Sequence, residues 1–141
     1  MAILERAKAL IAAQRPQDAL TAYKIGWDDT VAHGDHLGAS TIAHMAGVAE
    51  PDLAAKLEWN ERALGEADAE PDRAGMEPLY PSLYNNLAVS HALLGDRVAA
   101  LRYLRLARDR LGSLEPGPYA DRVREAILKR LTEFEAEQQG R

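Results

Sequence analysis

Residues 83–111 read LYNNLAVSHALLGDRVAALRYLRLARDRL, and they predict two helices on either side of a Gly-Asp step. Small and apolar side chains recur three or four residues apart in each half, which is the spacing of one helix face. Gly95 can take the left-handed conformation that ends the first helix, and Asp96 can accept backbone N–H bonds at the start of the second. We therefore expect two antiparallel helices whose inner stripes comprise Leu83, Leu87, Ser90 and Leu94, then Val98, Ala100, Leu101, Leu104, Ala107 and Leu111.

Residues 1–34 and 35–68 show the same pattern more faintly. In the first segment, Pro16 separates one helix from a second, which carries Ala19, Leu20, Tyr23 and Trp27. In the second segment, Asp35 is the expected N-cap and Pro51 the expected first residue of a helix. The inner stripe of that later helix is expected at Leu53, Leu57 and Leu64.

Two stretches rich in proline and glycine interrupt the helical pattern. Residues 69–82 predict a longer connection between helix pairs, and the run SLEPGP at 113–118 predicts a second break. After this break, a single amphipathic helix is expected at about 118–138, with its apolar face at Val123, Ile127, Leu131 and Phe134. Its polar outer face is typical of a helix that caps a stack of repeats.

Composition favours an all-α protein of the cytoplasm. Among the 141 residues alanine and leucine dominate, aromatic residues make up 6%, and cysteine is absent. The start of the chain lacks the pattern of a signal peptide, and no apolar run approaches a membrane span, so no membrane partner is expected.

Charge is uneven along the chain. Residues 1–70 hold 6 Lys/Arg against 12 Asp/Glu, whereas residues 71–141 hold 11 against 10. An acidic protein is a poor general binder of nucleic acid, so no nucleic-acid partner is expected. The basic residues Arg97, Arg105 and Arg108 share one face of the predicted helix, which either attracts an acidic partner or is a plain solvated surface.

The quoted stretch resembles the tetratricopeptide repeat, a helix–turn–helix motif of about 34 residues. Over residues 81–112, Tyr84 matches the aromatic start, Asn86-Leu87-Ala88 the triplet of Asn, Leu and a small residue, and Gly95-Asp96 the turn. The small, bulky and small positions of the second helix are occupied by Ala100, Leu104 and Ala107. The chain departs from the family at His91, Arg97 and Gly112.

Two further stretches resemble parts of the same repeat, LEWNERAL at 57–64 and DALTAY at 18–23. If Ala19, Lys56 and Ala100 are equivalent, the spacings are 37 and 44 residues, so the repeats contain insertions. The resemblance implies a single domain over 1–141, a short α-solenoid of three antiparallel helix pairs plus a C-terminal capping helix. The pairs would span about 1–34, 35–68 and 81–112.

In this family the first helices of the repeats line a concave groove that holds peptides or other partners. The resemblance therefore implies a non-catalytic module, an adaptor that binds a protein or peptide. The candidate binding residues are Thr41, His44 and Met45 in the second pair and Tyr84, Asn85, Asn86, Val89 and His91 in the third. For Asn85 and Asn86, the alternative is local hydrogen bonding that fixes helix packing.

Two other functions stay open. A small-molecule sensor would use His44, Tyr84, Asn85 and His91 as polar contacts in a closed pocket, although a histidine satisfied within the core is the alternative for both imidazoles. A homo-oligomer would form through an unfilled terminal face, since no cap precedes the helix expected to start at Met1. We expect core packing for Trp27 and Trp59.

The sequence gives no support for catalysis. It has no HExxH motif, no serine, histidine and aspartate arranged as a triad, and no glycine-rich phosphate loop. The four histidines, His33, His36, His44 and His91, lack the spacing of a structural metal site. We therefore expect neither a metal nor a cofactor.

Overall fold

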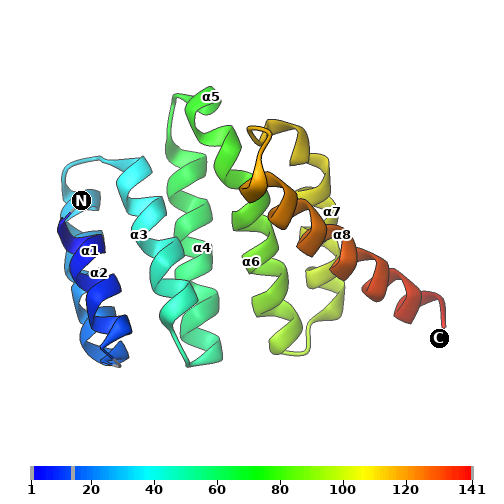
Figure 1. Ribbon diagram of the computed structural model, residues 1–141, viewed down its shortest axis with the longest axis horizontal. Helices are drawn as coiled ribbons and strands as arrows, with labels where there is room; N and C mark the ends of the chain where they lie inside the picture. Colours follow the sequence, from blue (N-terminus) through cyan, green and yellow to red (C-terminus); the bar gives the residue numbers. More distant parts are fainter. Residues whose placement is uncertain (1, 14, 141) are drawn as a thin grey trace. The chain divides into compact units, whose positions relative to one another are not determined.

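A computed structural model describes residues 2–13 and 15–140, and these residues fold into helices, turns and loops without a strand (Figure 1). The prediction of an all-α fold is confirmed. The chain divides between Pro71 and Asp72 into two compact units. The helix start expected at Met1 lies outside the described residues, and the single domain over 1–141 stays a prediction.

The described residues of the first unit form four helices, and each packs against the next along the chain. They are α1 (Ala2–Ala12), α2 (Pro16–Ala32), α3 (His36–Ala49) and α4 (Leu53–Ala69) (Figure 1). Gly34 takes a φ of +67°, and the Asp35 side chain accepts a bond of 2.9 Å from the Gly38 amide, so α3 is capped as expected. Pro51 was expected to open α4, and this is wrong. Asp52 is the N-cap, with a bond of 2.9 Å from Ala55 N, because its carboxylate can accept amide hydrogens that proline cannot bind.

Small residues bring α3 and α4 close together. The expected inner stripe of α4 is wrong, since Leu53 is 38% exposed and Leu57 and Leu64 are only partly buried. The buried face of α4 instead comprises Trp59, Asn60, Ala63 and Ala67. The physical reason is space, since a Cβ added at Gly47 of α3 would lie 2.5 Å from Asn60 Oδ1. Helices this close accept alanine between them, and larger aliphatic side chains lie at the margins.

Lys56 closes the end of α3. Its Nζ donates to the carbonyl of Gly47 at 2.6 Å and contacts that of Val48 at 3.4 Å. A cation at the C-terminal end of a helix satisfies carbonyls that have no partner in the helix and complements the helix dipole.

The second unit begins with a short helical segment. Residues 69–82 were expected to form a long connection, but most of this stretch is helical, in α5 (Arg73–Met76) and η1 (Glu77–Leu79), which lead directly into α6 (Tyr80–Leu93). Pro78 and Pro81 lie in the first turns of η1 and α6, where the missing N–H costs nothing, so they do not exclude helix. The segment is fastened by Arg110, whose Nη1 donates to both Glu77 carboxylate oxygens at 3.0 and 3.1 Å.

A tight turn joins α6 to α7 (Arg97–Asp109). Gly95 has a φ of +86° and the Asp96 side chain accepts a bond of 3.0 Å from Ala99 N, so both turn predictions are confirmed. Most of the expected inner stripe is buried, but Leu94 is 44% and Val98 83% exposed. Val98 precedes the buried Ala100 by two residues, or about 200° of helix rotation, and therefore faces the opposite side of α7.

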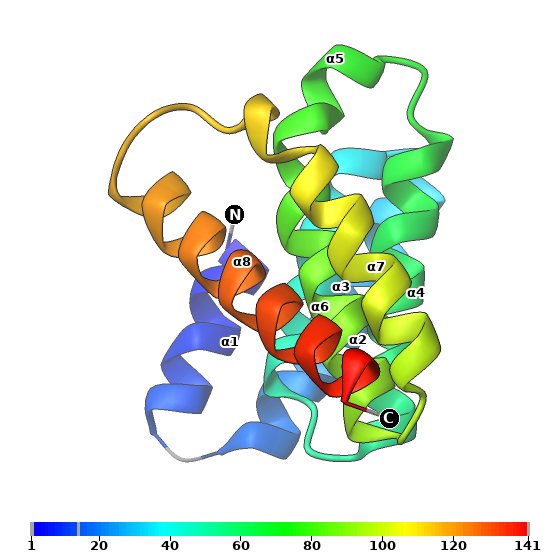
Figure 2. The same cartoon turned by 90° about the vertical axis from the view of Figure 1, so that its right-hand side faces the viewer.

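The last helix, α8 (Pro118–Gln139), follows η2 (Leu111–Ser113) and the break at Gly117, and it crosses the α6–α7 pair (Figure 2). Its apolar face is as expected, since Ile127 and Leu131 are buried and Phe134 is partly buried. Leu131 belongs to one cluster with Ala88, Leu101 and Leu104, so α8 completes a core that three helices share. Within the described part of the chain, no helix has both the length and the apolar character needed to span a membrane.

Candidate functional site

A groove of about 300 Å³ runs between α6 and α8. Its floor, the apolar part of its lining, consists of side chains of α6 together with Leu104 of α7 and Phe134 of α8. The remaining lining residues are charged, namely the cations Arg97 and Arg130 and the anion Glu133. The α6 residues in the groove are Ala88, Val89, Ala92 and Leu93, so the predicted binding residue Val89 lies in it.

Two hydrogen bonds tie α8 to the adjacent surface of α6. Arg130 Nη1 donates to Asn85 Oδ1 at 3.1 Å, and the hydroxyls of Ser82 and Tyr119 are bonded at 2.6 Å. Asn85, another predicted binding residue, thus holds Arg130 next to the groove. This bond agrees with the expectation that an amide in this position fixes helix packing, and it also places a cation where a ligand would lie.

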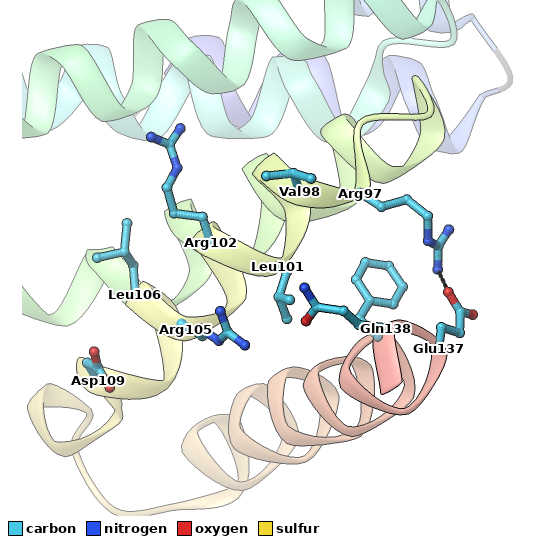
Figure 3. A pocket seen from close by; sticks show the side chains of 10 residues that line it. Arg97, Val98, Leu101, Arg102, Arg105, Leu106, Asp109, Glu137 and Gln138 are labelled. Atoms are coloured by element: carbon cyan, nitrogen blue, oxygen red, sulfur yellow. Dashed lines mark hydrogen bonds and ion pairs between the residues drawn. The ribbon is translucent and has the colours of Figure 1, made fainter. Parts of the chain in front are cut away.

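A second groove, of about 380 Å³, lies between α7 and the C-terminal half of α8 (Figure 3). Leu101 and Arg105 point from α7 toward α8, where Gln138 faces them, and Phe134 of α8 also lines the groove. Val98, Arg102 and Leu106 point away from α8 and form the outer rim of the groove on α7. Sequence reasoning missed this groove, because it assigned Val98 to the inner stripe.

Arg97 and Phe134 line both grooves and separate them. The Arg97 guanidinium lies 4.3 Å from the centre of the Phe134 ring and forms an ion pair with Glu137. The stacked cation and ring hold the C-terminal half of α8 against the start of α7. Both grooves therefore depend on the docking of α8.

Tyr84 and His91 belong to a row of stacked rings and line neither groove. His91 stacks on Tyr103 of α7 at 5.4 Å and Tyr103 on Tyr84 at 6.0 Å, and the Tyr80 ring contacts Tyr84 in a tilted arrangement at 5.5 Å. His91 Nδ1 also lies 3.8 Å from the carboxylate of Asp96, the N-cap of α7. These contacts give both predicted residues a structural role between α6 and α7, while the predicted Asn86 lies partly buried on α6.

The three predicted residues of the first unit lie on α3. Thr41 Oγ1 donates to the Leu37 carbonyl at 2.8 Å within the helix, and Met45 is partly buried. Burial lowers the pKa of His44 below the ordinary value of 6.5, which keeps its imidazole neutral near pH 7. His44 belongs to the first unit and His91 to the second.

The histidines do not gather into a metal site in the part of the chain that the structure describes. No group of three or more His, Cys, Asp or Glu side chains there is placed to hold an ion. His36 Nδ1 is bonded to Glu66 at 2.8 Å, which links α3 to α4. His33 Nδ1 lies 2.8 Å from the Asp29 carbonyl, and this hydrogen bond together with the Asp29 carboxylate raises the pKa of His33.

The tryptophans pack in the first unit, as expected. The rings of Trp27 and Trp59 meet edge to face at 6.1 Å, and the Arg62 guanidinium lies within 5.1 Å of both ring centres. This cluster accounts for both tryptophans by packing within the first unit.

Compared with known proteins, the chain matches no family model, no curated protein and no solved structure. The grooves themselves are therefore the evidence for function.

Proposed function

We propose that the chain is a non-catalytic interaction module, a divergent helical repeat protein of the tetratricopeptide type, which binds a peptide or protein segment in the α6–α8 groove. The observation that carries the proposal is the groove itself. Six of its nine lining side chains are apolar, four of them on one face of α6, and the other three are charged. Such a surface suits a chain segment that buries a few apolar side chains and pairs its polar groups at the edge.

The order of the helices supports the repeat assignment. The pairs α1–α2, α3–α4 and α6–α7 each consist of helices that follow one another and pack together, and α8 follows alone. With a reversal of direction at each turn, they would make three antiparallel pairs and a cap, the plan of a short α-solenoid.

Buried positions in two of the second helices also agree with a repeat. In α7, the small, bulky and small residues Ala100, Leu104 and Ala107 are buried. In α2, the same spacing carries buried Ala19, Tyr23 and Gly26. Helix α4 departs from this pattern, since its first equivalent position is Lys56, whose ammonium group is used at the end of α3.

The chemistry of the grooves supports a binding function over catalysis. The side chains that line the α6–α8 groove include no hydroxyl, thiol or imidazole that could act as a nucleophile. The small-molecule alternative stays a prediction. Two of its four residues, Tyr84 and His91, are engaged in the row of stacked rings.

A displayed library of random peptides, selected on the immobilised protein, tests the proposal. Affinities of the selected peptides are then measured by fluorescence polarisation for Val89→Arg, which places a long cation in the groove. We expect this variant to bind at least about tenfold more weakly, because the side chain covers the apolar floor.

The matched control is Val48→Arg, since Val48 is 60% exposed on α3 in the other unit and lines neither groove. Circular dichroism checks that both variants keep their helix content. Equal binding by the two variants would contradict the assignment of the α6–α8 groove as the binding site.

A further inference from the structure

The exposed face of α7 has the pattern of a helix that packs against another helix. The residues of α7 that line the α7–α8 groove recur three or four apart, as Val98, Leu101, Arg102, Arg105, Leu106 and Asp109, and among them Leu101 already packs in the core with Leu131. This is the i, i+3, i+4, i+7 spacing that one helix presents to a neighbour. Val98 and Leu106 remain 83% and 37% exposed, so the stripe has apolar area still to bury.

The arginines on this face are not fully neutralised by carboxylates. Both carboxylates in the groove are engaged, Glu137 with Arg97 and Asp109 with Arg108 at 3.1 Å. Arg105 has a single long contact of 3.6 Å, to Glu135. Among the described residues, no carboxylate lies within ion-pair distance of Arg102, which stacks on the Tyr103 ring at 5.0 Å. The charge left for a partner to neutralise is therefore positive.

We propose that the α7–α8 groove binds an amphipathic helix of a partner protein, which carries aspartate or glutamate beside its apolar stripe. This goes beyond the proposed function, because it concerns a second surface and specifies both the shape and the charge of the occupant. The apolar side chains of the partner helix cover Val98, Leu106 and Phe134, and its carboxylates reach Arg102 and Arg105. Complementary charge raises the association rate and excludes helices with basic flanks.

The length of the stripe fixes the size of the partner segment. From Val98 to Asp109 the helix rises about 16 Å, which corresponds to about three turns of a partner helix. Apolar residues at i, i+3 or i+4, and i+7 of a segment of about twelve residues would match it.

The experiment uses a displayed library of helical peptides with a fixed leucine stripe and random residues at the flanking positions, selected on the full-length protein. We expect enrichment of Asp and Glu over Lys and Arg at the flanks. Enrichment of basic residues, or no enriched helix, would overturn the proposal.

Variants of α7 then locate the bound helix. Val98→Glu should weaken binding of the enriched acidic helix at least about tenfold, whereas Val48→Glu, at a valine that is 60% exposed on α3, should leave it unchanged. Val98 lies in the first turn of α7, where a glutamate favours the helix, so a folding defect is not expected. Equal binding by the two variants would refute the site.

A charge exchange tests the arginine. Arg102→Glu should lose affinity for the acidic helix and gain affinity for the same helix with lysines in place of its acidic residues. An unchanged preference would refute the role of Arg102.

Two measurements distinguish this proposal from binding in the α6–α8 groove and from self-association. Val89→Arg should still bind the acidic helix, and loss of binding in that variant alone would place the helix in the α6–α8 groove and overturn the present proposal while the proposed function stands. Sedimentation of the free protein tests a second copy as the occupant. A dimer that Val98→Glu dissociates would assign the groove to self-association instead.

Discussion

Truncation of Leu131 to alanine tests whether α8 is an integral part of the second unit. Leu131 is 6% exposed and packs with Ala88, Leu101 and Leu104. Removing its three outer carbons forfeits about 2.4 kcal/mol of transfer free energy at ~0.8 kcal/mol per methylene, and the cavity left behind adds to this. Because α8 is packed on one side only and can shift to fill part of the cavity, we expect a total near the low end, about 2–4 kcal/mol.

The assay is urea unfolding followed by circular dichroism, with Leu128→Ala as the control. Leu128 lies on the same helix but is 39% exposed, so its truncation should change the free energy of unfolding by about 0.5 kcal/mol or less. Peptide binding should weaken in Leu131→Ala, since both grooves use side chains of α8. Equal, small losses of stability in the two variants would refute the packing described for α8.

Three further predictions concern single groups. Tyr23→Phe should leave the free energy of unfolding unchanged or slightly raised in urea titrations, because the buried Tyr23 hydroxyl has no hydrogen-bond partner among the described residues; a loss above about 1 kcal/mol would contradict this. Asp96→Ala should lower the free energy of unfolding by about 1 kcal/mol, because the cap of α7 is lost. Asp96→Asn can still accept the Ala99 N–H and should lower it by only a few tenths of a kcal/mol. Thermal melts compare the two variants, and equal losses would argue against the cap. The pKa of His44 is lowered by burial, so the unfolded chain takes up a proton first, and stability should fall as the pH drops below 6.5. Urea titrations at about pH 7.5 and 5.5 should show a smaller fall in the free energy of unfolding for His44→Leu than for the unchanged protein. An equal fall in both proteins would refute the role of His44.

The local signals of the sequence were sufficient for the longer helices and for two of the turns between them, but not for the start of α4 or for α5 and η1. Asp35 and Asp96 were identified as N-caps and Gly95 as a left-handed turn residue, because these roles depend on the residue and its immediate neighbours. The apolar face of α8 followed from spacing alone. Proline was harder to interpret, since Pro78 and Pro81 begin helices in a stretch that composition assigned to a connection.

The faces of helices were less predictable than their ends. In α4, the spacing of the leucines predicted the buried face, but the close approach of α3 at Gly47 favours Ala63 and Ala67 there. The buried face therefore depends on the neighbouring helix, which the pattern of α4 alone does not reveal. Val98 fits the apolar stripe by spacing alone, and only the structure, in which Ala100 is buried and Val98 is exposed, shows that Val98 faces outward. The α7–α8 groove could not be predicted either, because side chains of both helices form it and the sequence does not show where α8 packs on α7.

The candidate site was predicted in part. Val89 lies in the α6–α8 groove and Asn85 holds Arg130 beside it, whereas both were predicted to line a groove formed by the first helices of the repeats, so their role in binding stays a prediction. Tyr84 and His91 lie on the same helix but stack with Tyr103, a contact between α6 and α7 that the pattern of one helix does not reveal. A role in binding for Thr41, His44, Met45 and Asn86 stays a prediction.

Amide chemical-shift mapping with a peptide selected from the random library tests the central claim most directly, namely that the protein binds a partner segment beside α8. The account predicts that the largest shifts fall in residues 85–97 and 130–138, and that Val89→Arg removes them. Shifts confined to residues 15–71, or spread evenly along the chain, would contradict it.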